Sequence, residues 1–191
     1  GKIMATKATL EIATIDVEMF TFAEADGTEY LLKSASEITV APEIEEREAT
    51  KLIVKDRLIA QKRGSKTITG NTITLTDNVF SPELVLQLQG GEITYSDPGT
   101  NSKIESYTPP ASGADVKPKT FTGKAYSAVY DAAGEIVNYE CIEYPNCQGS
   151  PIEFSRKDGE FSVATYTITS APNKGQPPYK ITYVDALPVV G

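Results

Sequence analysis

The side chains that could do chemistry in this chain are carboxylates and two thiols, because its 191 residues contain no histidine. That absence excludes Ser-His-Asp triads, imidazole general bases and histidine metal sites. Acidic pairs occur at Glu45 and Glu46 and at Asp131 and Glu135, within charged runs and turns. A glycosidase needs a pocket that separates the pKa values of its two acids, and nothing in the sequence indicates one. We therefore expect no enzyme activity.

Sites for metals, phosphates or cofactors are not indicated either. The stretch from Asp97 to Asn101 offers oxygen ligands, but it lacks the alternating spacing of a calcium-binding loop and is typical of a turn. Gly90 and Gly91 follow a predicted helix, whereas phosphates bind where a helix begins. We expect no cofactor.

The two thiols are Cys141 and Cys147. They are too few for a structural zinc site without other ligands. A disulfide across the turn between them is one possibility. Free thiols are favoured, because the sequence shows no secretory signal.

Charge is most polarised in residues 42–64, where an acidic segment is followed by a basic one. The charged residues are Glu43, Glu45, Glu46 and Glu48, and then Lys51, Lys55, Arg57, Lys62 and Arg63. Two apolar triplets flank Lys55, Asp56 and Arg57, which predicts a β-hairpin whose turn lacks glycine. Either the charges only protect a solvated sheet edge, or the hairpin is an assembly arm. A head-to-tail pairing of acidic and basic halves between copies would propagate into rings or filaments.

A strand and a helix that could hold this arm in position are predicted within residues 67–91. Thr72, Thr74 and Thr76 alternate with Ile73 and Leu75, which predicts a strand with one buried face. A helix is predicted over residues 82–89. Ser81 and Pro82 are typical of its start, and Gly90 and Gly91 of its end. So short a helix must pack on a sheet to be stable.

The rest of the chain reads as strands and loops. We expect strands at residues 9–22, 29–33, 37–40, 92–95, 121–130, 135–144, 151–155, 161–169 and 179–184. A phase slip at Ala13 and Thr14 predicts a bulge in the first strand, and Pro42 is expected to end the strand at residues 37–40. Hairpin turns are expected at residues 24–28 and 131–134. A long loop is expected at residues 96–119, a loop at 145–150 and an apolar C-terminal arm from Ala186. This pattern predicts one mainly β domain over residues 1–191, a β-sandwich or barrel with one short flanking α-helix.

The run from Ile73 to Leu84 (Ile-Thr-Leu-Thr-Asp-Asn-Val-Phe-Ser-Pro-Glu-Leu), closed by Gly90 and Gly91, resembles the tail tube (major tail) proteins of tailed bacteriophages and phage-like particles. The resemblance implies a structural virion protein that forms hexameric rings. These rings stack into a hollow tail tube through which DNA is ejected. It implies a hairpin arm at residues 42–64 and places residues 121–144 and 161–169 as candidates for the inner sheet. The resemblance assigns no catalytic residue to this chain.

The partners implied by the resemblance are copies of the same chain and other tail proteins, namely the tape measure and the baseplate or terminator. DNA would pass through without specific binding, and the particle would be assembled in the cytoplasm of a host bacterium. The formal charge of −8 disfavours tight binding to nucleic-acid phosphates. No apolar run approaches the ~20 residues that cross a bilayer, so no membrane span is expected.

Two alternatives remain open at this point. A baseplate or tail-completion ring protein shares the tube fold and would form finite rings. A carbohydrate-binding or adhesin-like sandwich would need an exposed aromatic platform, and the chain has no tryptophan.

Overall fold

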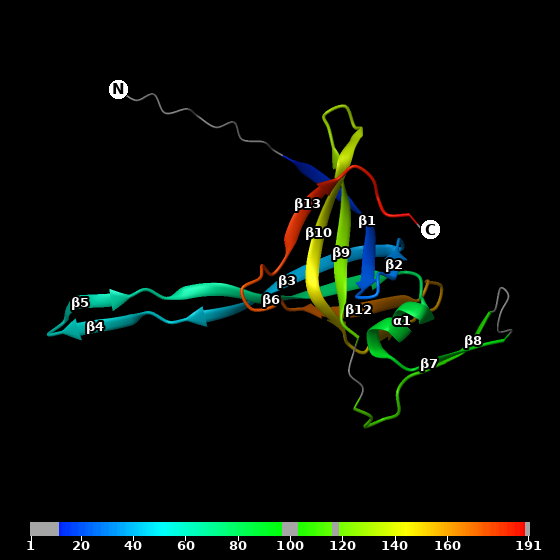
Figure 1. Cartoon of the computed structure of the whole chain (residues 1–191), viewed down its shortest axis with the longest axis horizontal. Coiled ribbons are helices and arrows are strands. Elements are labelled where there is room, and N and C mark those ends of the chain that lie inside the picture. Colours follow the sequence, from blue (N-terminus) through cyan, green and yellow to red (C-terminus); the bar gives the residue numbers. More distant parts are fainter. Residues whose placement is uncertain (1–11, 97–102, 116–118, 190–191) are drawn as a thin grey trace.

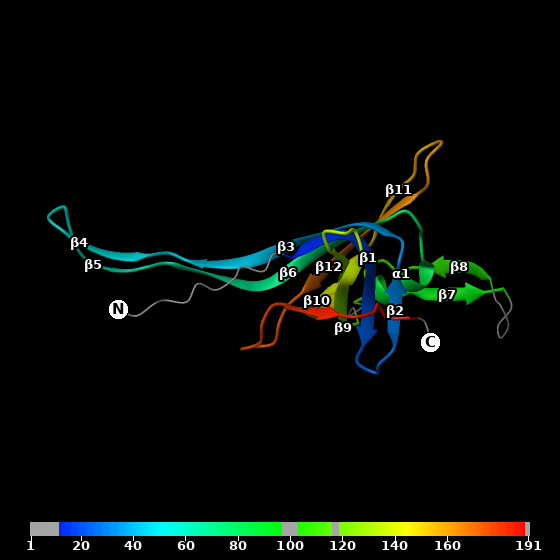
Figure 2. The ribbon, with the colours of Figure 1, turned by 90° about the horizontal axis from the view of Figure 1, so that it is seen from above.

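The chain folds into a large antiparallel sheet from which slender hairpins project (Figures 1 and 2). The computed structural model describes residues 12–96, 103–115 and 119–189. The strands are β1 (Ala13–Glu24), β2 (Glu29–Leu32), β3 (Ala35–Arg47), β4 (Thr50–Val54), β5 (Arg57–Lys62), β6 (Ser65–Asp77), β7 (Glu92–Tyr95), β8 (Ile104–Thr108), β9 (Phe121–Tyr130), β10 (Ile136–Gly149), β11 (Glu153–Ser155), β12 (Val163–Ser170) and β13 (Lys180–Val184). Within the described residues one α-helix, α1 (Pro82–Gln89), accompanies them. The expected mainly β fold with a single short helix is confirmed.

The main sheet has the order β2-β1-β9-β10-β12-β6-β3, with β13 also paired to β10 and β11 to β12. Strand β10 belongs to both halves of this sheet. Its first part pairs with β9 as far as Tyr144 and again at Cys147, and Cys147 to Gly149 pair with β12. The register shifts between these parts, where Asn146 has a φ of +45°. The halves therefore fold over each other, so that β1, β9, β10 and β13 stand upright in Figure 1 while β3, β6 and β12 run across.

The core lies between these two halves. Phe20 and Phe22 from β1 meet Ile73 and Leu75 from β6, with Tyr166 from β12. All five side chains are fully buried. The predicted alternation is confirmed in the inner part of β6, where Ile73 and Leu75 are fully buried while Thr72, Thr74 and Thr76 are half-buried. Burial of each such aliphatic side chain stabilises the fold by roughly 1.5–3 kcal/mol.

Helix α1 covers one side of this core with Leu84, Val85 and Leu88, the face expected from the sequence. Pro82 begins the helix and Gly90 ends it with a φ of +76°, so both predicted boundaries are confirmed. Ser81 occupies the N-cap position, but its side chain forms no capping hydrogen bond in the described structure. Its backbone carbonyl instead accepts a hydrogen bond from the Val85 N–H at 3.1 Å.

The bulge in β1 lies further along the chain than predicted. The register with β9 shifts between Ile15 and Met19, and Asp16 has a φ of +67°. The expected slip at Ala13 and Thr14 is wrong, because both residues pair regularly with β9. Residues 9–11 of the expected first strand lie outside the described residues.

The first hairpin turn, by contrast, forms at residues 24–28 as expected. Gly27 takes a φ of +92° there, and β1 and β2 pair on either side.

Three predicted breaks in strands are wrong. Strand β3 continues through Pro42 to Arg47, because β3 is the outer strand of the sheet and a proline there disrupts no pairing on its free side. All but the last residue of the expected loop at residues 145–150 belong to the outer part of β10, where Cys147 to Gly149 pair with β12. The expected long loop contains β8, which pairs with β7. Residues 97–102 and 116–118 of that loop lie outside the described residues.

The β7–β8 hairpin is attached to the end of α1 by a tyrosine. The hydroxyl of Tyr107 donates a hydrogen bond to the Gly90 carbonyl at 2.6 Å and accepts one from the Gln89 side-chain amide at 2.8 Å. These two bonds cross from β8 to the helix terminus, a contact that no local sequence pattern indicates.

Candidate assembly interface

The longest extension is a two-stranded ribbon, here called the arm, formed by residues 41–69 (Figures 1 and 2). It consists of the outer parts of β3 and β6, which continue into β4 and β5. Every residue from 41 to 69 is exposed, and Gly70 is the first buried residue after it. At ~3.3 Å per residue, the strand from Pro42 to Val54 reaches about 40 Å. The arm is therefore longer than the range of 42–64 expected from the sequence.

The arm ends in a tight turn without glycine. Lys55 and Asp56 both take left-handed backbone conformations, with φ of +48° and +62°. Two successive positive φ values are typical of a type I′ turn, whose twist matches that of paired strands. The predicted hairpin is thus confirmed, since Val54 and Arg57 pair on either side of this two-residue turn.

The outer half of the arm, here called the tip (residues 50–63), exposes aliphatic side chains on both faces of the ribbon. Leu52 lies opposite Ala60 on one face, and Ile53 lies opposite Leu58 on the other. The side chains of Leu52, Ile53, Val54, Leu58 and Ile59 are between 47% and 60% exposed. A two-stranded ribbon has no second layer to cover either face. Apolar area of this kind on a projecting element marks a protein interaction surface.

The charged residues predicted for the interface lie along this ribbon in two groups. Glu43, Glu45 and Glu46 are in the part of β3 nearest the body, and Glu48 follows in the connection to β4. The basic residues belong to the tip, with Lys51 in β4, Lys55 in the turn, Arg57 and Lys62 in β5 and Arg63 in the connection to β6. The structure thus separates the acidic group from the basic group along the length of the arm.

Two of the glutamates have partners on β6. Glu46 forms an ion pair with Lys66 at 3.5 Å, and the Glu43 carboxylate accepts a hydrogen bond from the Thr72 hydroxyl at 2.6 Å. Both contacts are exposed, so each contributes at most about 1 kcal/mol to stability. Among the described residues, the five basic residues of the tip form no ion pair. Their charges remain available to a partner.

Two apolar residues of the arm were missed by the sequence reasoning. Ile44 and Ile68 lie opposite each other where the arm leaves the body, and they are 56% and 40% exposed. The available signal was the alternation of apolar and charged residues through Pro42, which the expected strand end at that proline concealed.

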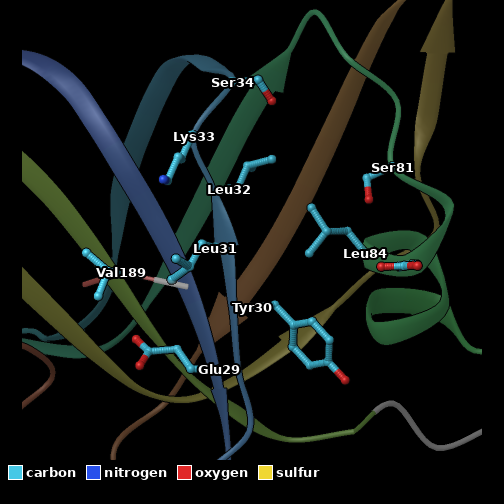
Figure 3. Close-up of a pocket in the computed structure, with 10 residues that line it drawn as sticks. Glu29, Tyr30, Leu31, Leu32, Lys33, Ser34, Ser81, Leu84 and Val189 are labelled. Carbon is cyan, nitrogen blue, oxygen red and sulfur yellow. The ribbon is translucent and has the colours of Figure 1, made fainter. Parts of the chain in front are cut away.

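A second surface that a partner could cover is the outer edge of β2. In the described strand order, β2 lies at one end of the sheet and β3 at the other. A cavity of about 480 Å³ follows this edge and is lined by residues from both faces of β2. Figure 3 shows Tyr30 and Leu84 between β2 and α1, whereas Glu29 and Val189 lie across β2 from them. Burial raises the pKa of the Tyr30 hydroxyl. The cavity therefore lies along the edge strand β2, and its lining is not a set of catalytic groups.

The C-terminal segment partly covers the outer face of the sheet. Leu187 packs against a small cluster of Met19, Tyr126 and Cys141, whereas Val189 is 83% exposed. The start of the expected C-terminal arm thus packs against the sheet of its own molecule. Val190 and Gly191 lie outside the described residues.

Both cysteines are free and buried, as favoured from the sequence. They lie in different apolar clusters on opposite faces of the sheet. Burial raises the pKa of the Cys147 thiol to about 11, so it is protonated and unreactive near neutral pH.

The described residues contain no group of three or more acidic or cysteine side chains that could hold a metal ion. The turn at residues 97–101 lies outside them. Among the helices described, none is long and apolar enough to cross a membrane.

Comparison with known proteins finds likenesses among solved structures. No protein-family profile matches the chain, and no characterised protein matches its sequence. Among solved structures, a chain in the cryo-EM structure of the anti-feeding prophage baseplate, determined with six-fold symmetry, aligns over 94% of this chain and 97% of its own. The identity is 8% and the TM-score is 0.40. A likeness at this level carries no argument about function, which must be inferred from the chain's own residues.

Proposed function

We propose that this chain is a structural subunit of a phage tail or phage-like particle that assembles with copies of itself. The observation that carries the proposal is the arm, in which 29 consecutive residues are exposed although they include a row of aliphatic side chains. Such a ribbon gains stability only when a partner covers it. The polarised charges of the arm suit a head-to-tail contact between identical chains, which extends an assembly instead of closing a dimer.

The finer proposal is that the assembly is a tail tube. Hexameric rings would close through the free edges of β2 and β3 and stack through the arms. Closure satisfies edges that a lone sheet leaves open. The acidic character of the chain, with a net charge of −8, suits a conduit along which DNA slides without phosphate contacts. The sequence resemblance of residues 73–91 to tail tube proteins supports the same reading.

A baseplate or tail-completion ring is the alternative that the arm supports equally well. In that case the rings would be finite, because the contacts on one face would suit a different protein.

The decisive experiment is negative-stain electron microscopy of the purified full chain over a range of concentrations and salt. We expect hollow tubes built from stacked rings. Finite rings would support the baseplate alternative. A chain that stays monomeric under every condition would refute self-assembly in both forms.

A further inference from the structure

Two hairpins other than the arm leave the body near α1, and neither has much support of its own. Strands β7 and β8 form a separate two-stranded sheet, and β11 joins the main sheet only by a short pairing with β12. Figure 2 shows the two hairpins pointing in different directions. A two-stranded hairpin is only marginally stable in water, so contacts at its base must fix its direction.

Gln89, the last residue of α1, is hydrogen-bonded to the bases of both hairpins. Its side-chain oxygen accepts a hydrogen bond from the backbone N–H of Ile152, the residue before β11, at 3.0 Å. Its side-chain nitrogen donates one to the hydroxyl of Tyr107, in β8, at 2.8 Å. That hydroxyl in turn donates to the Gly90 carbonyl at 2.6 Å. We call these three consecutive hydrogen bonds the Gln89 relay.

The direction of every bond in the relay follows from the first one. A backbone N–H can only donate, so Gln89 must turn its oxygen toward Ile152 and its nitrogen toward Tyr107. The hydroxyl of Tyr107 is then an acceptor from Gln89, and its own proton goes to Gly90. Hydrogen bonds that point the same way along a chain polarise and strengthen one another. Loss of one bond therefore weakens its neighbours in the relay.

The relay is held against the core at both ends. Ile152 and Tyr107 each pack against the buried core cluster, and all three bonds are partly buried, which limits competition from water. Gly91 has a φ of +106°, and a Cβ atom there would clash with the Thr108 carbonyl oxygen and stand 3.0 Å from the Tyr107 hydroxyl. The base of the β7–β8 hairpin thus lies as close to the end of α1 as a residue without a side chain permits.

We propose that Gln89 couples the two hairpins, so that the β7–β8 hairpin and the β11 hairpin set their directions together and not independently. A partner that moves one hairpin then biases the other, and the reverse holds by the same amount because coupling between two sites is reciprocal. The coupling acts within one chain, so it goes beyond the proposed assembly and does not depend on it.

The decisive test changes one hairpin and measures the other. Tyr107→Phe removes only the hydroxyl and keeps the ring that packs on the core. Since Gln89 then loses the acceptor for its nitrogen, its hold on Ile152 should loosen as well. Hydrogen exchange measured by mass spectrometry should show the Ile152 amide exchanging about two- to fivefold faster, although Tyr107 forms no hydrogen bond with Ile152 in the described structure.

Two references make this exchange result specific. Tyr183→Phe also removes a hydroxyl that donates a hydrogen bond, to the Glu140 carboxylate at 3.3 Å, but outside the relay. It should leave exchange at Ile152 at the wild-type rate. The amide of Ala128, buried in β9, reports on opening of the whole fold and should not change in Tyr107→Phe. Unchanged exchange at Ile152, or equal acceleration at Ala128, would overturn the coupling.

A distance measurement tests the directions themselves. Spin labels at Thr94→Cys in β7 and Ser155→Cys in β11 occupy exposed positions, and the native thiols are buried and do not take up the label. Dilution of labelled chains with unlabelled ones removes distances between copies. Pulsed electron resonance should give one narrow distance distribution for this background and a clearly broader one after Gln89→Ala.

Gln148→Ala is the matched control for the distance measurement. Gln148 also forms a side-chain hydrogen bond, to the Thr120 hydroxyl at 3.3 Å, but it is exposed and outside the relay. This control should keep the narrow distribution. A Gln89→Ala variant with the same distribution as the control would show that the two hairpins hold their directions without Gln89, whether or not the chain assembles.

Discussion

Gly149 of β10 lies directly against Leu88 of α1, so closely that a Cβ atom on the glycine would stand 2.6 Å from the Leu88 Cβ. The same added atom would also stand 2.6 Å from the backbone carbonyl oxygen of Leu88. Helix α1 can therefore approach the outer part of β10 only because that position has no side chain.

The first prediction follows from this contact. Gly149→Ala should displace α1 and lower the free energy of unfolding by about 1–3 kcal/mol, the usual cost of overpacking. Urea denaturation monitored by circular dichroism measures the change. Gln148→Ala, at the exposed neighbouring position, should cost less than about 0.5 kcal/mol. Equal stability of the two variants would show that the helix tolerates the extra methyl group.

The second prediction concerns Asp77, a fully buried carboxylate at the end of β6. Its Oδ1 accepts a hydrogen bond from the Val79 N–H at 3.0 Å and so shapes the chain between β6 and α1. Asp77→Ala should leave that donor without its partner and cost about 1–3 kcal/mol in chemical denaturation. Asp77→Asn keeps an acceptor oxygen and should lose less. An alanine variant as stable as the asparagine variant would contradict this role.

The third prediction tests the charges of the tip. Changing Lys51, Lys55 and Arg57 together to glutamate should shorten the assemblies seen by electron microscopy, because the tip would repel glutamates of the neighbouring copy. The melting temperature should stay within a few degrees of the wild type, since these side chains are exposed.

The matched control reverses Arg156, Lys157 and Lys174, an exposed set with the same composition that lies off the arm. It should leave assembly lengths unchanged. Assemblies of wild-type length from the tip variant would refute the assembly role of the arm.

The fourth prediction is that assembly weakens with salt. Exposed charges are screened over ~10 Å at 0.1 M ionic strength and over ~3 Å at 1 M. Analytical ultracentrifugation should therefore show the monomer fraction rising across that range at fixed protein concentration. The apolar part of the contact should persist, so high salt should raise the concentration needed for assembly without abolishing it. An assembly indifferent to salt would argue against charge pairing between copies.

The fifth prediction is a loss of stability at alkaline pH. Burial raises the pKa of the Cys147 thiol from 9.0 to about 11, so between these values the unfolded chain releases a proton that the folded chain retains. Stability contributed by the neutral thiol is thus complete below pH 9 and is lost as the pH rises to about 11. The full loss is about 3 kcal/mol at most. Burial also raises the pKa of Tyr144, to about 12, which extends the decline.

Cys147→Ala provides the comparison. Its unfolding free energy, measured by urea titration at several pH values, should fall less steeply than that of the wild type between pH 9 and 11. Near pH 7 the two slopes should agree, because the thiol is neutral in both states there. Parallel curves throughout would show that Cys147 titrates normally in the folded chain.

Short stretches of sequence were enough to predict α1, the β1–β2 and β9–β10 hairpins and the alternation of residues 72–76 in β6. Each of these elements depends on residues that are close together in the sequence, such as Pro82 and Gly90 at the two ends of the helix. The hairpin at Lys55 and the charges of the arm were likewise visible in the sequence, because neighbouring residues specify a turn and its flanking strands.

Tertiary structure decided the features that depend on which strands are neighbours. Pro42 ends a strand only if its missing N–H leaves a partner unpaired, and the sequence does not reveal that β3 is an outer strand. Cys147 lies in a strand because β12 pairs with the outer part of β10, and Tyr107 anchors β8 through a contact with the end of α1. The apolar groove lined by Val40, Ile142 and Ile181 arises in the same way, since these residues meet only when the sheet folds over itself. Pairings between distant segments depend on the packing of the whole core, which no short stretch of sequence encodes.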